Sequence, residues 1–173
     1  IGSGAEIALK EKIEKIGKPL KEWDVKINYG IKTGLNEAFI IDRTTRDRLI
    51  AEDPKSAEII KPILRGRDIK RYGYEFAELY LLQTGYDIDV PKLYPVIFNH
   101  LLQYEVKARK RDDQGRNWWN LRACVYYNEF ENEKMVWAET GQEIKMSIVG
   151  PDIFLNKTCF LITGENLRYI SSV

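Results

Sequence analysis

The side chains of this sequence that are best suited to chemistry are cations, and they gather in two short segments. Residues 61–72 contain five Lys or Arg side chains against one Asp, and residues 105–122 contain six against three acidic residues. These segments carry net charges of +4 and +3, so a chain whose total is +1 has −6 on its remaining residues. If the two segments meet in space, they form a face that attracts phosphate. The alternative is two separate solvated stretches of surface, one of them the end of a helix.

Amides and aromatic rings interrupt the cations of the second segment, where Asn-Trp-Trp-Asn occupies residues 117–120. Arg can pair bidentately with guanine and Asn with adenine, while aromatic rings stack on exposed bases or wedge between them. This mixture is typical of nucleic-acid recognition. Neighbouring residues of a strand point to opposite faces, so we expect at least one of Trp118 and Trp119 to be a core residue, while the other can be exposed.

Other kinds of active site find little support in the sequence. The chain has one histidine, His100, and two cysteines, Cys124 and Cys159, which are too few ligands for a zinc ribbon or finger. Neither a Gly-x-x-x-x-Gly-Lys-Ser/Thr loop nor a dinucleotide Gly-x-Gly-x-x-Gly motif occurs. Glu143 and Lys145 have the Glu-x-Lys spacing that a metal-dependent nuclease can use, but this spacing arises often by chance in a chain that is 31% charged.

The hydrophobic pattern predicts an α+β fold, and 173 residues suffice for one domain with its own core. We expect helices in the first two thirds of the chain and a strand-rich last third. The predicted helices cover residues 5–16, 45–52 (capped by Thr44), 54–60 and 91–109, and the predicted strands cover residues 25–31, 38–41, 78–83, 135–138, 144–149, 154–155 and 159–163. The first two strands should form a β-hairpin whose tip carries Lys32, Thr33 and Asn36.

The first predicted helix has a narrow apolar seam formed by Leu9, Ile13, Ile16 and, just beyond its end, Leu20. Two interpretations remain open: the seam is a stripe buried against this domain, or it contacts a neighbouring domain. No apolar run approaches the roughly 20 residues that span a membrane. No secretory signal pattern is present either, so we expect no membrane partner and a cytoplasmic location.

A series of motifs resembles one known family. In chain order these are residues 29–41 (Tyr-Gly-Ile-Lys-Thr-Gly-Leu-Asn-Glu-Ala-Phe-Ile-Ile), 63–72 (Ile-Leu-Arg-Gly-Arg-Asp-Ile-Lys-Arg-Tyr), 94–101, 118–122 (Trp-Trp-Asn-Leu-Arg), 135–139 (Met-Val-Trp-Ala-Glu) and 154–160 (Phe-Leu-Asn-Lys-Thr-Cys-Phe). Together, over roughly residues 20–173, they resemble the TaqI-like C-terminal specificity domain. That is the target-recognition domain of type IIG restriction–modification enzymes and related DNA adenine-N6 methyltransferases.

The resemblance implies a sequence-specific DNA recognition domain that docks in the major groove of double-stranded DNA and positions it for a separate catalytic domain. The family's N-terminal methyltransferase carries an Asn/Asp-Pro-Pro-Tyr/Phe motif, which this sequence lacks. The fragment is therefore expected to be no enzyme by itself and to hold no cofactor or metal, with S-adenosylmethionine bound by the covalently linked methyltransferase domain. Residues 1–19 would be the connector helix to that domain, and residues 20–173 the recognition domain.

Charge pattern and resemblance together define the residues expected to contact DNA. They are Lys32, Thr33, Asn36, Arg65, Arg67, Lys70, Arg71, Lys107, Arg109, Lys110, Arg111, Arg116, Asn117, Trp118 and Arg122. Two alternatives remain. A protein-interaction or structural module would account for the near-neutral total charge and the apolar seam, and a metal-dependent nuclease would use Glu143 and Lys145.

Overall fold

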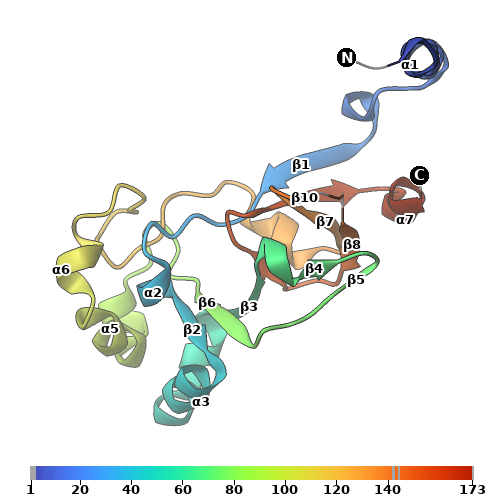
Figure 1. Ribbon diagram of the computed structural model, residues 1–173. Helices are drawn as coiled ribbons and strands as arrows, with labels where there is room; N and C mark the ends of the chain where they lie inside the picture. Colours follow the sequence, from blue (N-terminus) through green and yellow to red (C-terminus); the bar gives the residue numbers. More distant parts are fainter. Residues whose placement is uncertain (1–2, 142, 144, 173) are drawn as a thin grey trace.

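Two four-stranded sheets and a two-stranded ribbon form the centre of the molecule, and helices lie at its two ends (Figure 1). The computed structural model describes residues 3–141, 143 and 145–172. Helices and strands alternate along the first part of the chain, and most of the last third is strand. The α+β prediction is therefore confirmed.

The first sheet is antiparallel throughout and has the strand order β1-β10-β7-β8. Its strands are β1 (Val25–Tyr29), β7 (Lys134–Ala138), β8 (Met146–Val149) and β10 (Cys159–Gly164). The alternating apolar runs of the last third predicted three of these strands, and the prediction is confirmed for the residues described. Ile144, the first residue of the strand predicted over 144–149, lies outside the described residues.

The second sheet combines distant parts of the chain in the order β2-β6-β3-β9. Its strands are β2 (Ile40–Asp42), β3 (Ile60–Leu64), β6 (Leu79–Leu82) and β9 (Phe154–Leu155). β9 lies parallel to β3, with Ile63 opposite Phe154, and the backbone N–H of Asn156 donates to the carbonyl of Leu64 at 2.9 Å. The C-terminal third therefore completes the sheet of the first half. The ribbon pairs β4 (Ile69–Lys70) with β5 (Gly73–Tyr74).

The hairpin predicted from residues 25–31 and 38–41 does not form. β1 pairs with β10, β2 pairs with β6, and the helix α2 (Asn36–Phe39) occupies the first half of the second predicted strand. The chain leaves the first sheet at Gly30, where a Cβ atom would collide with the carbonyl oxygen of Asn156. Contact with β9 thus directs this segment away from β1, so local alternation does not determine its partner.

The helix predicted over residues 91–109 is also wrong, because the chain forms three short helices there: α4 (Val90–Leu93), α5 (Pro95–Leu102) and α6 (Glu105–Ala108). Pro95 disfavours a helical conformation at the preceding residue, and Tyr94 accordingly has φ −138° and ψ 63°. The remaining breaks fall at Gln103 and Tyr104.

The other helices agree more closely with expectation. α1 (Gly4–Ile16) begins with a capping box made by Ser3 and Glu6. α3 (Arg43–Glu52) is capped by Asp42, whose carboxylate accepts from the N–H of Thr45, and not by Thr44 as predicted. α7 is Leu167–Ser172, and the 3₁₀ helices are η1 (Leu20–Glu22), η2 (Pro54–Ile59, which begins at Pro54 as predicted), η3 (Gly66–Asp68) and η4 (Tyr127–Glu131).

The core contains a buried cation as well as apolar side chains. Phe130 stacks on Phe154 at 4.8 Å between ring centroids, which joins η4 to β9. Nearby, the ammonium group of Lys134 has no exposed surface and donates to the carbonyls of Phe130, Asn132 and Gly150 at 2.7–2.9 Å. Burial lowers the pKa of Lys134 from its ordinary value of 10.5 to about 8.

This buried ammonium predicts a specific dependence of stability on pH. Between about pH 8 and 10.5 the unfolded chain holds the Lys134 proton more tightly than the folded chain, so raising the pH increases the free energy of unfolding. Urea denaturation of the native protein and of Lys134→Met across this range measures their free energies of unfolding. We expect the native value minus the variant value to rise with pH. A difference independent of pH would contradict a depressed pKa.

Candidate nucleic-acid interface

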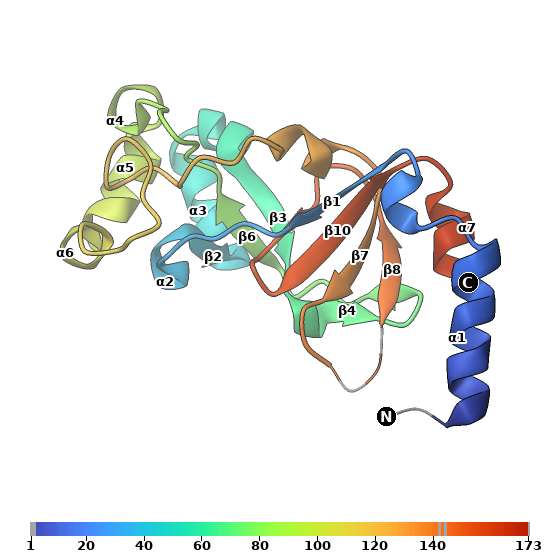
Figure 2. The same ribbon diagram turned by 90° about the horizontal axis from the view of Figure 1, so that it is seen from above.

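The two basic segments lie on the same side of the molecule, with α2 between them. Residues 61–72 run through β3, η3 and β4, and residues 105–122 form α6 and the loop after it. α6, α2 and β4 follow one another along the lower edge of the view in Figure 2. Lys107 of α6 is paired with Glu37 of α2 at 2.8 Å. Asn36, at the start of α2, lines the same cleft as the η3 residues Gly66 and Arg67. α2 thus lies between the two basic segments and itself contributes a carboxylate, Glu37, and no cation.

A cleft of 820 Å³, here called the η3 cleft, opens beside the first basic segment. Its cationic lining consists of Arg65, Arg67, Lys70 and Lys145, with Glu143 as the single carboxylate among the lining residues described. The remaining described lining residues are Asn36, Gly66, Ile69, Ala138, Thr140, Gly141, Asn156 and Thr158. Lys70 is paired with Glu75 at 3.2 Å, so the excess of positive charge is small, and the cleft also presents amide and hydroxyl groups that can form hydrogen bonds.

The wall of the η3 cleft is held rigid by an ion pair. The guanidinium of Arg65 donates to both carboxylate oxygens of Asp68 at 3.0 and 2.8 Å, and the backbone N–H of Arg65 donates to the same carboxylate at 2.8 Å. Burial by itself raises the pKa of Asp68, but these hydrogen bonds outweigh it and hold the pKa below its usual range. Arg67, between the two, is left exposed at the turn.

Close backbone packing sets the depth of this cleft. A Cβ atom on Gly66 would lie 2.8 Å from the carbonyl oxygen of Thr158, so only glycine allows η3 to approach the β9–β10 turn this closely. The hydroxyl of Thr158 accepts a hydrogen bond from the Gly66 N–H at 2.9 Å and donates to Asn156 at 2.5 Å. Asn156 and Thr158 lay within a motif of the resemblance but were not among the predicted contact residues.

A second cleft of 470 Å³, here called the α6 cleft, lies at the other basic segment. Its lining includes Arg109, Gln114, Arg116 and Asn117, with both tryptophans at its base. The Arg109 guanidinium lies 5.5 Å from the Trp118 ring centroid and is also paired with Glu105 at 2.7 Å. The Gln114 side-chain amide donates hydrogen bonds to the carbonyls of Arg109 and Arg111. The Arg116 side chain, which also lines the cleft, is exposed.

Three of the predicted DNA-contacting side chains are instead buried: Thr33, Arg111 and Trp118 are 1%, 7% and 5% exposed. Trp118 and Trp119 both pack against Phe98. They lie in a turn rather than on a strand, and Trp119 is half-buried. The expectation that at least one of the two tryptophans is a core residue is confirmed by Trp118, although the strand from which it was argued does not form.

Arg111 has a structural environment that the charge pattern did not predict. Its guanidinium donates to the carbonyls of Thr33 at 2.5 Å, Asp113 at 2.9 Å and Trp118 at 2.8 Å, and also to that of Asn120. The group lies 4.2 Å from the ring centroid of Phe39. Burial lowers the pKa of Arg111 to about 10, so the guanidinium remains charged at neutral pH. It joins the loop of the α6 cleft to the segment that leads into α2.

The other predicted residues are accessible to differing degrees. Exposed side chains are those of Lys32, Asn36, Arg67, Arg71, Lys107, Arg109, Lys110 and Arg116, and half-buried ones are those of Arg65, Lys70, Asn117 and Arg122. Asn36 is oriented by the Thr33 hydroxyl, which donates to its amide oxygen at 2.7 Å. Glu143 and Lys145, the nuclease alternative, line the η3 cleft. Among the described residues, no three His, Cys, Asp or Glu side chains are grouped so that they could hold a metal ion.

Comparison with solved structures places this fold among known ones. The type IIL restriction-modification enzyme MmeI, solved in complex with DNA, aligns with a TM-score of 0.61 and 13% identity, over 84% of this chain and 20% of that one. The type IIG restriction endonuclease BpuSI aligns with a TM-score of 0.53 and 12% identity, over 95% of this chain and 21% of that one. The fold is related to theirs.

This chain thus spans about a fifth of the length of each of these two enzymes. At such low identity the likeness establishes the fold, and the TaqI-like assignment stays a prediction. Neither a protein-family model nor a curated protein matches the sequence. No helix within the described residues is long and apolar enough to cross a membrane.

The buried guanidinium of Arg111 provides a test of how the interface is held together. Arg111→Ala leaves four carbonyls without their charged donor, and we expect the free energy of unfolding to fall by about 2–4 kcal/mol. Arg116→Ala, on the exposed part of the same loop, should change it by less than about 0.5 kcal/mol. Urea denaturation of both variants measures these effects. Equal, small losses would show that Arg111 does not hold the loop.

Proposed function

We propose that this chain is a sequence-specific recognition domain for double-stranded DNA within a restriction–modification system. The observation that carries the proposal is that each of the two basic segments borders a cleft, the η3 cleft and the α6 cleft, in which cations lie next to amide or hydroxyl groups. The fold shared with segments of MmeI and BpuSI supports the same role. A net charge of +1 is compatible with it, since the two basic segments together carry +7.

The two clefts differ in the contacts that they can make. The α6 cleft offers long cationic side chains, Arg109 and Arg116, which suit phosphate oxygens whatever the base sequence. The η3 cleft adds Asn36, Thr140 and Arg67 to its cations, and amide, hydroxyl and guanidinium groups can distinguish base edges in the major groove. We therefore assign base reading to the η3 cleft and backbone positioning to the α6 cleft.

The N-terminal helix supports attachment to another domain. α1 lies at the end of the molecule opposite α6 (Figures 1 and 2), and none of its residues is buried. Leu9, Ile13 and Ile16 are 58%, 60% and 75% exposed, so the interpretation that this chain buries the apolar seam is wrong. We propose that α1 connects to a covalently linked methyltransferase domain. In this proposal that domain binds S-adenosylmethionine and the present chain catalyses no reaction itself.

Salt dependence of duplex binding tests the role of the cationic clefts. A side chain that neutralises a phosphate releases counterions, so Arg67→Ala and Arg116→Ala should each reduce the slope of log K against log salt by about 1. Lys15→Ala, on exposed α1, is the matched control and should leave the slope unchanged. Fluorescence anisotropy of duplex binding at several salt concentrations measures this slope. Unchanged isotherms for both arginine variants would remove the proposed DNA-binding face.

Base reading by the η3 cleft predicts a different signature. Asn36→Ala should relax the preference at one position of the bound sequence, by roughly 1–3 kcal/mol of discrimination. Selection of bound duplexes from a randomised pool measures the preference. Arg116→Ala serves as the comparison, because loss of a phosphate contact should weaken all sequences alike. If both variants select the same sequences as the native protein, Asn36 does not read a base.

A further inference from the structure

The β4–β5 ribbon ends in a two-residue turn formed by Arg71 and Tyr72. The backbone N–H of Tyr72 donates to the carbonyl of Met146 at 2.9 Å, which holds the turn against β8. Lys70, directly before the turn, and Lys145, directly before Met146, both line the η3 cleft. The turn therefore lies at the rim of that cleft.

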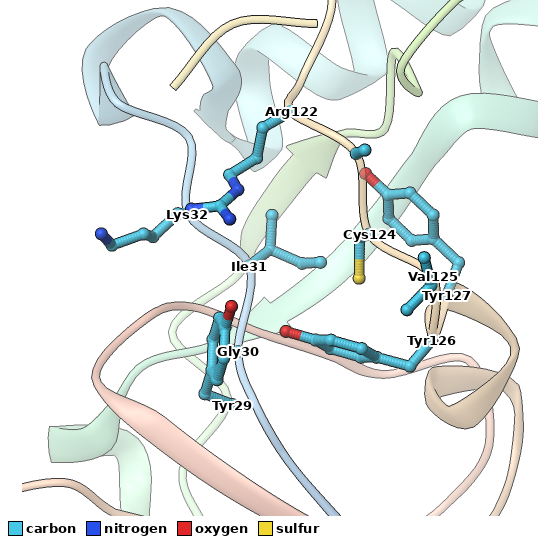
Figure 3. A pocket seen from close by; sticks show the side chains of 10 residues that line it. Tyr29, Gly30, Ile31, Lys32, Arg122, Cys124, Val125, Tyr126 and Tyr127 are labelled. Carbon is cyan, nitrogen blue, oxygen red and sulfur yellow. The ribbon is translucent and has the colours of Figure 1, made fainter. Parts of the chain in front are cut away.

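The side chain of Tyr72 is largely unsupported by the rest of the chain. At 72% exposure it is the most exposed aromatic residue of the described structure. Some other exposed rings rest on a second ring: Tyr29 meets Tyr126 edge to face, with centroids 5.7 Å apart, beside a cavity of 190 Å³ (Figure 3). Phe76 meets Tyr80 in the same way at 5.6 Å. The ring of Tyr72 instead extends into solvent, so it contributes little buried area to the fold.

The backbone of Tyr72 also adopts an unfavourable conformation. Its φ is +64°, in the left-handed region. Glycine and asparagine are favoured at the third position of a turn with this φ, whereas a bulky aromatic residue rarely adopts it. Tyrosine therefore costs free energy at this position without a compensating gain in burial. A contact outside this chain would account for its ring.

A cation accompanies the ring at the tip of the ribbon. The guanidinium of Arg71 is exposed and lies 5.4 Å from the centroid of the Tyr72 ring. Aromatic rings stack on the faces of bases or wedge between them, and a neighbouring guanidinium can bind the flanking phosphate. Both groups stand beside the cleft to which base reading is assigned.

From this combination we propose that Tyr72 is a wedge: its ring opens a base step of bound duplex DNA and stacks on the exposed base. Arg71 binds the phosphate of the same step, next to the bases that the η3 cleft reads. This inference rests on the proposed function. It adds a contact whose strength depends on stacking and not on charge, and a way for the domain to sense how easily a base step unstacks.

Photochemical crosslinking detects such a stack directly. The probes are duplexes of the sequence that the native protein selects from a randomised pool, with 5-iodouracil or 5-iodocytosine replacing one pyrimidine at a time in either strand. Irradiation joins the iodinated base to an aromatic ring stacked on it, and mass-spectrometric fragment ions identify the residue. We expect a crosslink to Tyr72 from one base step. No crosslink to Tyr72 from any position, or one formed equally by the unpaired strand, overturns the wedge.

Tyr72→Asn removes the ring and replaces it with a side chain that suits the positive φ. We expect duplex affinity to fall by about tenfold. The slope of log K against log salt should not change, because the ring carries no charge. The urea midpoint should rise, since asparagine relieves the backbone strain, so that unfolding cannot account for the lost affinity.

Two further variants act as controls for the ring. Tyr72→Phe keeps it and should bind within about twofold of the native protein, because stacking needs only the aromatic face. Tyr74→Leu removes a 39% exposed ring from the same ribbon, where φ is not positive, and should leave affinity unchanged.

Failure of the wedge and failure of the proposed function give different results in anisotropy. If the native chain binds no duplex, the proposed function is wrong and the wedge is wrong with it. If the native chain binds and Tyr72→Asn binds equally well, only the wedge is overturned. A loss of affinity in Tyr72→Asn together with a salt slope reduced by about 1 also overturns it, because a phosphate contact and not a stack has then been lost.

Discussion

The buried guanidinium of Arg111 is the contact on which the arrangement of the interface depends. It satisfies carbonyls from Thr33, Asp113, Trp118 and Asn120, which belong to two loops far apart in the sequence. Its two terminal nitrogens make these hydrogen bonds, while its buried Nε has no partner in the described structure. A buried cation is costly without such bonds, so the two loops must keep the positions that provide them. One loop bears Arg116 of the α6 cleft, and the other leads to Asn36 of the η3 cleft. A single buried group thereby sets the geometry between the two clefts.

A second constraint joins the two sheets and shapes the η3 cleft. β9 is contributed by the last third of the chain yet pairs with β3, and the turn that follows it contacts both Gly30 and Gly66. Both glycines allow backbone to approach backbone where a side chain would not fit. The cleft is therefore formed by turns on paired strands, a suitable support for side chains that, in the proposed function, contact a duplex.

Charge and fold give complementary information about function. The near-neutral total conceals two basic segments that together carry +7, and the fold is related to parts of MmeI and BpuSI. Neither observation alone leads to DNA recognition, since basic surface stretches are common and folds host many functions. The clefts provide the link, because they hold the cations next to groups able to distinguish bases.

By itself, the sequence determined the elements whose signals are local. Capping residues and apolar periodicity were sufficient for α1, and runs of apolar residues for β6 through β10, because a few neighbouring residues decide those conformations. The two basic segments were visible for the same reason. Strand partners were decided only by the tertiary structure: β1 and β2 looked like one hairpin, yet each pairs with a distant strand. Burial was decided there too, since Arg111 and Arg116 are indistinguishable in charge. Carbonyls from distant loops surround Arg111 and leave Arg116 exposed, and no local pattern records those contacts.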